Sequence, residues 1–276
     1  MAADNAGDGV INVVATTNVY GDVAQRVGGA AVEVTSLIER ADQDPHEFEA
    51  SGRDQLALSR ADIVIVNGGG YDDFASTMLA ASGNSSAQVV DAVTISGFDA
   101  TADGFNEHVF YDYPTMAGVA DELATALHRL DPAHADTFDA NARAFASDLS
   151  ALEQREAALA GLTSGAGVII TEPVPLYVLL AGGFDNLTPA KFSAAIEDDT
   201  DVPATLLQSV LNLISGGSVA VVVYNSQTGG PQTDAIIEVA TDALVPLIGI
   251  GETLPEGTNY IDWQSGLLDD LTDAVS

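Results

Sequence analysis

Two histidines and two glutamates have the residue types and positions expected of a metal site. His46 lies in "DPHEFE" and His108 in "FNEHVFYD", while Glu172 follows the apolar run "GVIIT" and Glu252 follows "VPLIGIG". Each position falls at the end of an expected strand or in a connecting loop, where open α/β sheets bind ligands. A carboxylate at the end of a buried strand costs several kcal/mol in desolvation unless it is paired or coordinates a cation.

The chain has only eight Lys and Arg residues to compensate such carboxylates, so a metal ion is a candidate counter-charge. Two imidazoles and two carboxylates form a nitrogen and oxygen donor set suited to Mn²⁺, Zn²⁺ or Fe²⁺, without the sulfur that softer ions prefer. Taken alone, His46 is equally compatible with a solvated or hydrogen-bonded loop histidine. We interpret His128 and His134, which lie near helix ends, as surface residues.

Short apolar runs separated by helical segments must position these four residues. Apolar strands that alternate with helices are typical of parallel sheets buried on both faces. The sequence therefore predicts an α/β fold with mainly parallel sheets covered by helices. The apolar runs are 10–17, 32–38, 61–70, 167–173, 218–225 and 245–253.

The middle of the chain predicts one long helix. After "DP" at 131–132, an apolar stripe that includes Phe138, Phe145 and Leu159 continues over about 28 residues, roughly 40 Å in helical form. Pro132 suits the first helical turn. A helix of this length is typical of a strut between two lobes. We expect an N-terminal α/β lobe at 1–130, a connecting helix at 131–160 and a C-terminal α/β lobe at 161–276.

Composition and missing motifs exclude several functions. With 41 Asp and Glu against 8 Lys and Arg, the net charge is −33. Nucleic acid is excluded as a partner, because phosphate binding requires a basic surface. The sequence has no cysteine, no GxGxxG or GxxxxGK[ST] phosphate loop and no GxSxG elbow. The polar start "MAADNAGDGV" resembles a mature N-terminus behind an added methionine.

Four segments, in order along the chain, carry a resemblance to a known family. "DPHEFE" resembles a D-P-H-x-[YF]-E motif, and "NEHVFYD" is similar to N-P-H-x-W-x-D, with Glu107 replacing proline and Phe110 replacing tryptophan. "ITEPVPLYVLLAGGF" contributes Glu172 as a third motif, and "IGIGETLPEG" contributes Glu252 as a fourth. Along essentially its whole length, the chain resembles the zinc- and manganese-binding solute receptors of ABC importers.

This resemblance implies two lobes bridged by the long helix, with one metal ion in the cleft between them. The two histidines would come from the first lobe and the two glutamates from the second, so that all four bind the ion. The resemblance also suggests three residues that orient the imidazoles, namely Asp44, Phe110 and Asp112.

The resemblance further implies capture and delivery of the ion, with no reaction catalysed. The expected partners are an ABC permease and its ATPase subunits. We expect a monomer that works outside the cytoplasm, at the cell surface or in the periplasm. A lipid attached upstream of these residues would tether it to the membrane.

The sequence leaves the metal and two rival functions open. Carboxylate ligands favour Mn²⁺, whereas the Irving–Williams order favours Zn²⁺. The resemblance adds a slight preference for Mn²⁺, because many zinc-binding members of that family have a histidine-rich loop and none lies between His46 and His108 here. A mononuclear metallohydrolase could use the same residues, with one glutamate as general base. A receptor of the same architecture for an organic metal chelate is the other alternative.

The charge balance predicts a halophilic source, and a merely acidic mesophilic protein is the alternative. At about 1 M salt the Debye length falls to roughly 3 Å, which screens repulsion between exposed carboxylates. We therefore expect the thermal unfolding midpoint to rise by several degrees when KCl is increased from dilute buffer to molar concentration. Circular dichroism melting curves measure this shift. An unchanged midpoint would contradict the halophilic prediction.

Overall fold

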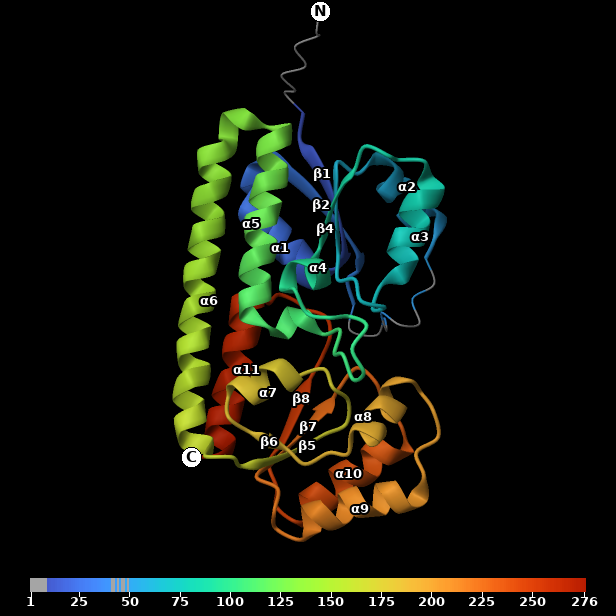
Figure 1. Cartoon of the computed structure of the whole chain (residues 1–276), viewed down its shortest axis with the longest axis vertical. Coiled ribbons are helices and arrows are strands. Elements are labelled where there is room, and N and C mark those ends of the chain that lie inside the picture. Colours follow the sequence, from blue (N-terminus) through green and yellow to red (C-terminus); the bar gives the residue numbers. More distant parts are fainter. Residues whose placement is uncertain (1–8, 41–42, 44, 46–47, 49) are drawn as a thin grey trace, which may run out of the picture. The chain divides into compact units, whose positions relative to one another are not determined.

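The computed structural model describes residues 9–40, 43, 45, 48 and 50–276 of the chain. Two of the predicted site residues, His46 and Asp44, lie outside these described residues. The chain divides into two compact units, each built from segments that are separate in sequence (Figure 1). Unit 1 comprises Met1–Ala100, Tyr113–Ser150 and Thr253–Tyr260, and unit 2 comprises Thr101–Asp112, Ala151–Glu252 and Ile261–Ser276.

Unit 1 contains a parallel sheet with the strand order β2-β1-β3-β4. Helices α1, α4 and α5 lie on one side of this sheet, and α2 and α3 lie on the other (Figure 1). Its elements are β1 (Ile11–Thr17), α1 (Asn18–Gly28), β2 (Val32–Ile38), α2 (Gly52–Arg60), β3 (Ile63–Val66), α3 (Asp73–Ser82), β4 (Gln88–Asp91), α4 (Ala92–Ser96) and α5 (Tyr113–Leu130). All four residues of β3 are buried, as expected for a strand covered on both faces.

Unit 2 contains a second parallel sheet, with the order β6-β5-β7-β8. Side chains of α8, α9 and α10 form one hydrophobic core with β5 and β7, which includes Phe192, Ile214 and Ile236. Figure 1 shows α7 and α11 on the other side of this sheet. Its elements are β5 (Gly167–Ile170), α7 (Leu176–Ala181), β6 (Asp185–Asn186), α8 (Ala190–Glu197), α9 (Ala204–Ser215), β7 (Val221–Asn225), α10 (Pro231–Asp242), β8 (Leu247–Ile250) and α11 (Tyr260–Ala274).

The long helix α6 (Ala135–Thr163) has 29 residues and contributes to both units. A short 3-10 turn, Pro132–His134, precedes it, and the Asp131 side chain caps this turn by accepting a 3.2 Å hydrogen bond from the Ala133 amide. The predicted apolar stripe is buried throughout, at Phe138, Ala142, Phe145, Leu149, Leu152 and Leu159. Burial of one helix face explains why the apolar spacing persists over so many residues.

The predicted fold class is confirmed, with two parallel sheets covered by helices and a long helix between them in sequence. All six apolar runs contain a strand, whereas β4 and β6 were not predicted. The contiguous lobe boundaries at 130 and 160 stay a prediction.

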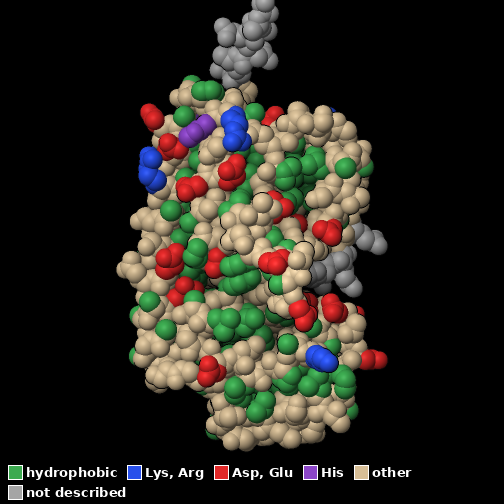
Figure 2. Space-filling view, in the orientation of Figure 1, with side chains coloured by type: hydrophobic (Ala, Val, Ile, Leu, Met, Phe, Trp, Pro, Cys, Tyr) green, Lys and Arg blue, Asp and Glu red, His purple; other side chains and the backbone are tan. Residues whose placement is uncertain are grey.

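Two surface properties of the described residues bear on function. None of the described helices has both the length and the apolar character that crossing a membrane requires. On the face drawn in Figure 2, Asp and Glu side chains are dispersed over many elements and do not form a single patch. Dispersed exposed carboxylates hold divalent ions weakly, so specific binding requires a buried cluster.

Candidate metal centre

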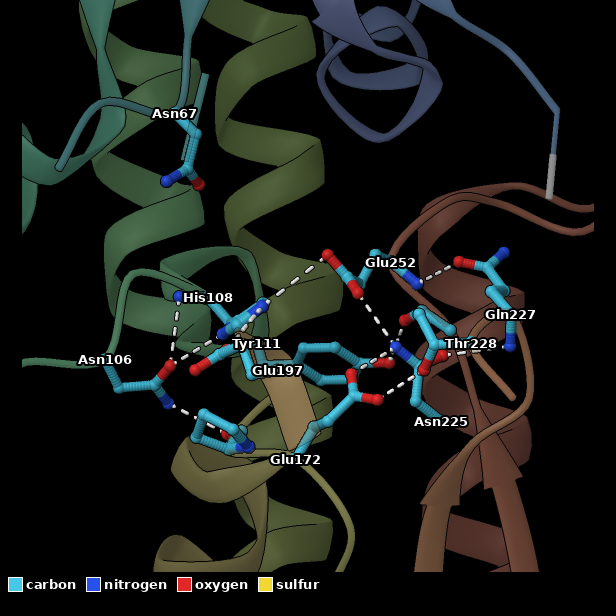
Figure 3. Close-up of polar contacts among 12 residues, drawn as sticks. Asn67, Asn106, His108, Tyr111, Glu172, Glu197, Asn225, Gln227, Thr228 and Glu252 are labelled. Atoms are coloured by element: carbon cyan, nitrogen blue, oxygen red, sulfur yellow. Dashed lines mark hydrogen bonds and ion pairs between the residues drawn. The ribbon is translucent and has the colours of Figure 1, made fainter. Parts of the chain in front are cut away.

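Strand ends and one loop of unit 2 bring polar side chains to a common edge of its sheet. Strands β5, β7 and β8 are parallel neighbours, so their carboxyl ends lie together. Glu172 follows β5, Asn225 ends β7 and Glu252 follows β8. His108 joins them from the loop before a short 3-10 helix, Val109–Tyr111 (Figure 3). Three of the four predicted ligands therefore lie in one cluster.

Asn225 connects the two glutamates. The side-chain nitrogen Nδ2 of Asn225 donates to Glu172 Oε2 at 2.6 Å and to Glu252 Oε1 at 2.8 Å (Figure 3). Its Oδ1 accepts from the Gln227 amide at 3.0 Å, which fixes the orientation of the side chain. The Thr228 hydroxyl donates to the other oxygen of Glu172. Neutral donors thus hold two buried carboxylates side by side without neutralising them.

His108 is fully buried and faces two carboxylates. Its Nε2 lies 3.6 Å from Glu252 Oε2 and 3.6 Å from Glu197 Oε1. On the other side of the ring, Nδ1 lies 2.7 Å from Asn106 Oδ1. One ring nitrogen of His108 therefore faces the side-chain amide of Asn106, and the other faces two acidic side chains.

Asn106 determines which ring nitrogen of His108 carries the proton. Its Nδ2 donates to the Pro173 carbonyl at 3.0 Å, and its Oδ1 accepts from the His108 amide at 3.2 Å. Because Oδ1 can only accept, Nδ1 of the ring must be the donor. In the neutral ring the lone pair is then on Nε2, directed toward the carboxylates. A proton or a metal ion between these atoms would stabilise this arrangement.

The pKa of His108 reflects this arrangement. Burial alone lowers the pKa, but the nearby carboxylate of Glu252, with the charges of Glu197 and Glu107, outweighs it and raises the pKa to about 8. The raised pKa favours a proton on Nε2 in the metal-free protein. A divalent cation would have to displace that proton to bind.

The carboxylates show the complementary effect. Burial raises the pKa of Glu172, opposed by hydrogen bonds from Thr228 and Asn225 and reinforced by the charge of Glu252. Burial is also the largest cause that raises the pKa of Glu197 to about 8, and the neighbouring carboxylates add to it while the imidazole opposes it. Negative charge is therefore unfavourable here until a cation arrives.

Glu197 was missed by the sequence analysis. Oxygens of Glu197 and Glu107 and a ring nitrogen of His108 all lie within 4.8 Å of one another, so these residues could hold a metal ion. Glu197 ends α8 in the acidic stretch "EDDTD", where it resembles an exposed helix-end residue. No sequence signal separates it from its exposed neighbours.

The remaining predicted residues have varied positions. Phe110 is buried, and its ring packs edge-on against the His108 ring at 5.8 Å between centroids, in accord with a supporting role. Asp112 lies near Glu156 of α6, whose pKa is raised to about 8, first by burial and then by the charge of Asp112. The proposed roles of these residues, and of His46 and Asp44, stay predictions.

Comparison with known proteins gives one family match over most of the chain and relatives that cover from about half to nearly all of it. Residues 13–274 match the family described as ZnuA, zinc-uptake complex component A, periplasmic. The manganese-binding lipoprotein MntA of Bacillus subtilis (strain 168) is 26% identical over 247 residues, which cover 87% of this chain and 79% of the relative.

Two solved structures share the fold. The crystal structure of ZnuA has a TM-score of 0.79 at 18% identity, covering 97% of this chain and 98% of that one. FpvC from Pseudomonas aeruginosa, in complex with Mn²⁺, has a TM-score of 0.78 at 22% identity, covering 97% and 98%. At these identities the likeness establishes the fold alone.

The tautomer assignment can be tested by nuclear magnetic resonance. At pH 9.5, above its pKa, we expect metal-free His108 to carry its proton on Nδ1. In unit 1, His128 Nε2 lies 3.1 Å from the Ala135 carbonyl, which can only accept, so His128 should carry the opposite tautomer. Long-range ¹H–¹⁵N spectra distinguish the two. Asn106→Ala should abolish the Nδ1 preference of His108 and leave His128 unchanged; an Nε2–H tautomer of His108 in the wild type would contradict the assignment.

Proposed function

The chain belongs to the ZnuA family of periplasmic zinc-uptake components, which it matches over residues 13–274. From this family membership we propose that the chain is the metal-binding receptor of an ABC importer. Its cargo is a divalent transition-metal ion, Mn²⁺ or Zn²⁺. We assign the ligands to His108, Glu172 and Glu252 in unit 2 and to His46, which lies outside the described residues. The receptor binds and releases the ion and catalyses no reaction.

The observation that supports the proposal most is that a buried imidazole lies close to buried carboxylates. His108 Nε2 lies 3.6 Å from Glu252 Oε2, and the amide of Asn225 joins Glu252 to Glu172. Neutral imidazole nitrogen and carboxylate oxygen are the donors that Mn²⁺, Fe²⁺ and Zn²⁺ accept in proteins. Asn106 supports this role, because it holds the ring with Nε2 as the ligand atom.

Family membership favours a receptor over the two alternatives that the sequence left open. A metallohydrolase and a receptor for an organic chelate would each need a separate observation in their favour, and the described residues supply none. Carboxylates contribute more donors to the assigned set than a three-histidine site would, which favours Mn²⁺. The manganese-binding name of the MntA relative points the same way.

The importer role implies the partners and the location. We propose that the receptor docks on a membrane permease driven by ATPase subunits and works outside the cytoplasm. The MntA relative is named a lipoprotein, which supports a lipid anchor for this chain. We also propose that the receptor is monomeric, since one copy supplies all the assigned ligands.

Removing a ligand tests the proposed function. His108→Ala and Glu172→Ala should each lower the affinity for Mn²⁺ and Zn²⁺ by more than about 100-fold, because loss of a direct ligand exceeds the usual effect of its supporting residues. Isothermal titration calorimetry of metal-stripped protein measures the affinity and the expected stoichiometry of one ion. His128→Ala removes a half-exposed imidazole from unit 1 and serves as the control. Wild-type affinity in both ligand variants would refute the assignment.

Metal affinity should depend on pH. Because the pKa of His108 is raised to about 8, the ion competes with a proton at every lower pH. Affinity should fall by up to about tenfold per pH unit below 8, and more steeply where the carboxylates also take protons. The stability of the metal-free protein should change with pH in the opposite direction. The contribution of His108 to the free energy of unfolding is fully present below about pH 6.5 and is lost as the pH rises through 8. Titrations between pH 5.5 and 8.5 measure the slope; a constant affinity over this range would contradict it.

A further inference from the structure

The end of helix α8 fixes the position of Glu197. The Thr200 amide donates to the Ala195 carbonyl at 2.9 Å and the Asp199 amide to the Ile196 carbonyl at 3.1 Å, the pair of bonds that closes a Schellman motif. Asp199 has the left-handed φ of 47° that this motif requires. Glu197 is therefore held in the last turn of the helix. The partial negative charge of a helix C-terminus disfavours a carboxylate at this position.

The side chain of Glu197 is turned inward despite this cost. It is 14% exposed, and its Oε1 lies 3.6 Å from His108 Nε2. Among the described residues, Oε1 is buried and has no hydrogen-bond partner. The next residue, Asp198, is exposed. Two consecutive acidic residues at one helix end thus have different environments, and the less exposed one, Glu197, faces the candidate metal centre (Figure 3).

The distances suit a shared cation. Oxygens of Glu197 and Glu252 each lie 3.6 Å from the same imidazole nitrogen. Ligand atoms bound at about 2.0 to 2.2 Å from one ion, with bond angles of about 90 to 120°, lie roughly 2.8 to 3.8 Å apart. Each oxygen is therefore at a distance from Nε2 that two ligand atoms of one ion can have, and an ion bound to Nε2 would lie within reach of Glu197 Oε1. It would also offset both the burial and the unfavourable helix end.

We propose that Glu197 is a further ligand of the transported cation, binding through Oε1 and adding a carboxylate oxygen that favours Mn²⁺ over Zn²⁺. This inference rests on the proposed function, since it concerns the same ion. The four assigned ligands already complete the tetrahedral set that Zn²⁺ prefers in proteins. Mn²⁺ suits carboxylate donors and accepts more of them, so an additional oxygen benefits it more.

Glu197→Gln tests the proposal, because the amide keeps the shape of the side chain but is a much weaker ligand. We expect this variant to lose about tenfold or more in Mn²⁺ affinity and less than about threefold in Zn²⁺ affinity. Asp198→Asn is the matched control, since it removes the same charge from the adjacent exposed residue. It should bind both ions within about twofold of the wild type. Calorimetric titration with Mn²⁺ alone and Zn²⁺ alone measures both affinities.

A second variant separates coordination from charge. Glu197→Asp keeps the charge but shortens the side chain by one methylene, so a ligand role predicts a loss of Mn²⁺ affinity of about fivefold or more. Wild-type Mn²⁺ affinity in either Glu197 variant, or an equal loss for both ions in Glu197→Gln, would overturn the inference. Failure of the wild type to bind either ion would remove the proposed function as well. If His108→Ala abolishes binding while Glu197→Gln retains it, only the inference fails.

Discussion

A fully buried imidazole in unit 2 directs its second nitrogen at carboxylate oxygens, and the rest of the site depends on this contact. Electron pairs on nitrogen and oxygen repel unless a positive charge lies between them. In the metal-free protein a proton supplies that charge, which is why the pKa of His108 is raised although burial alone would lower it. In the proposed site, a divalent cation would supply more charge and would bind His108 and Glu252 together. Competition between proton and metal is therefore a direct consequence of the geometry.

The supporting residues are neutral, and this choice has a physical reason. Asn106 holds the imidazole and Asn225 holds the two glutamates, each through amide hydrogen bonds. An arginine or lysine in either place would satisfy the carboxylates permanently and remove the advantage of binding a cation. Lys191, the single lysine of the chain, is exposed on α8. Amides thus fix the geometry while leaving the negative charge available.

The sequence predicted those strands and site residues whose surroundings in the fold restrict the residue type. Strand β3 is buried at every position and was recognised, whereas β4 has an exposed Val89 and β6 has two residues, so these edge strands gave no continuous apolar signal. Glu172 and Glu252 could be predicted because each follows an apolar strand.

Asn225 also lies at the end of an apolar strand, because it is the last residue of β7. It was not predicted because only charged residues and histidines were considered as site residues. Glu197 follows no apolar strand. Its inward direction follows from how the last turn of α8 packs, and in the sequence it is one acidic residue among several. Only the three-dimensional structure separates it from Asp198.

That separation bears on how a chain with a net charge of −33 can bind an ion selectively. An exposed carboxylate such as Asp198 keeps its water, so a passing cation gains little by approaching it and is screened by salt. A buried carboxylate such as Glu172 has already lost its water during folding, and a cation restores the interaction that burial removed. Abundant surface acids therefore do not compete with the site, and affinity is set by the few carboxylates that folding desolvates.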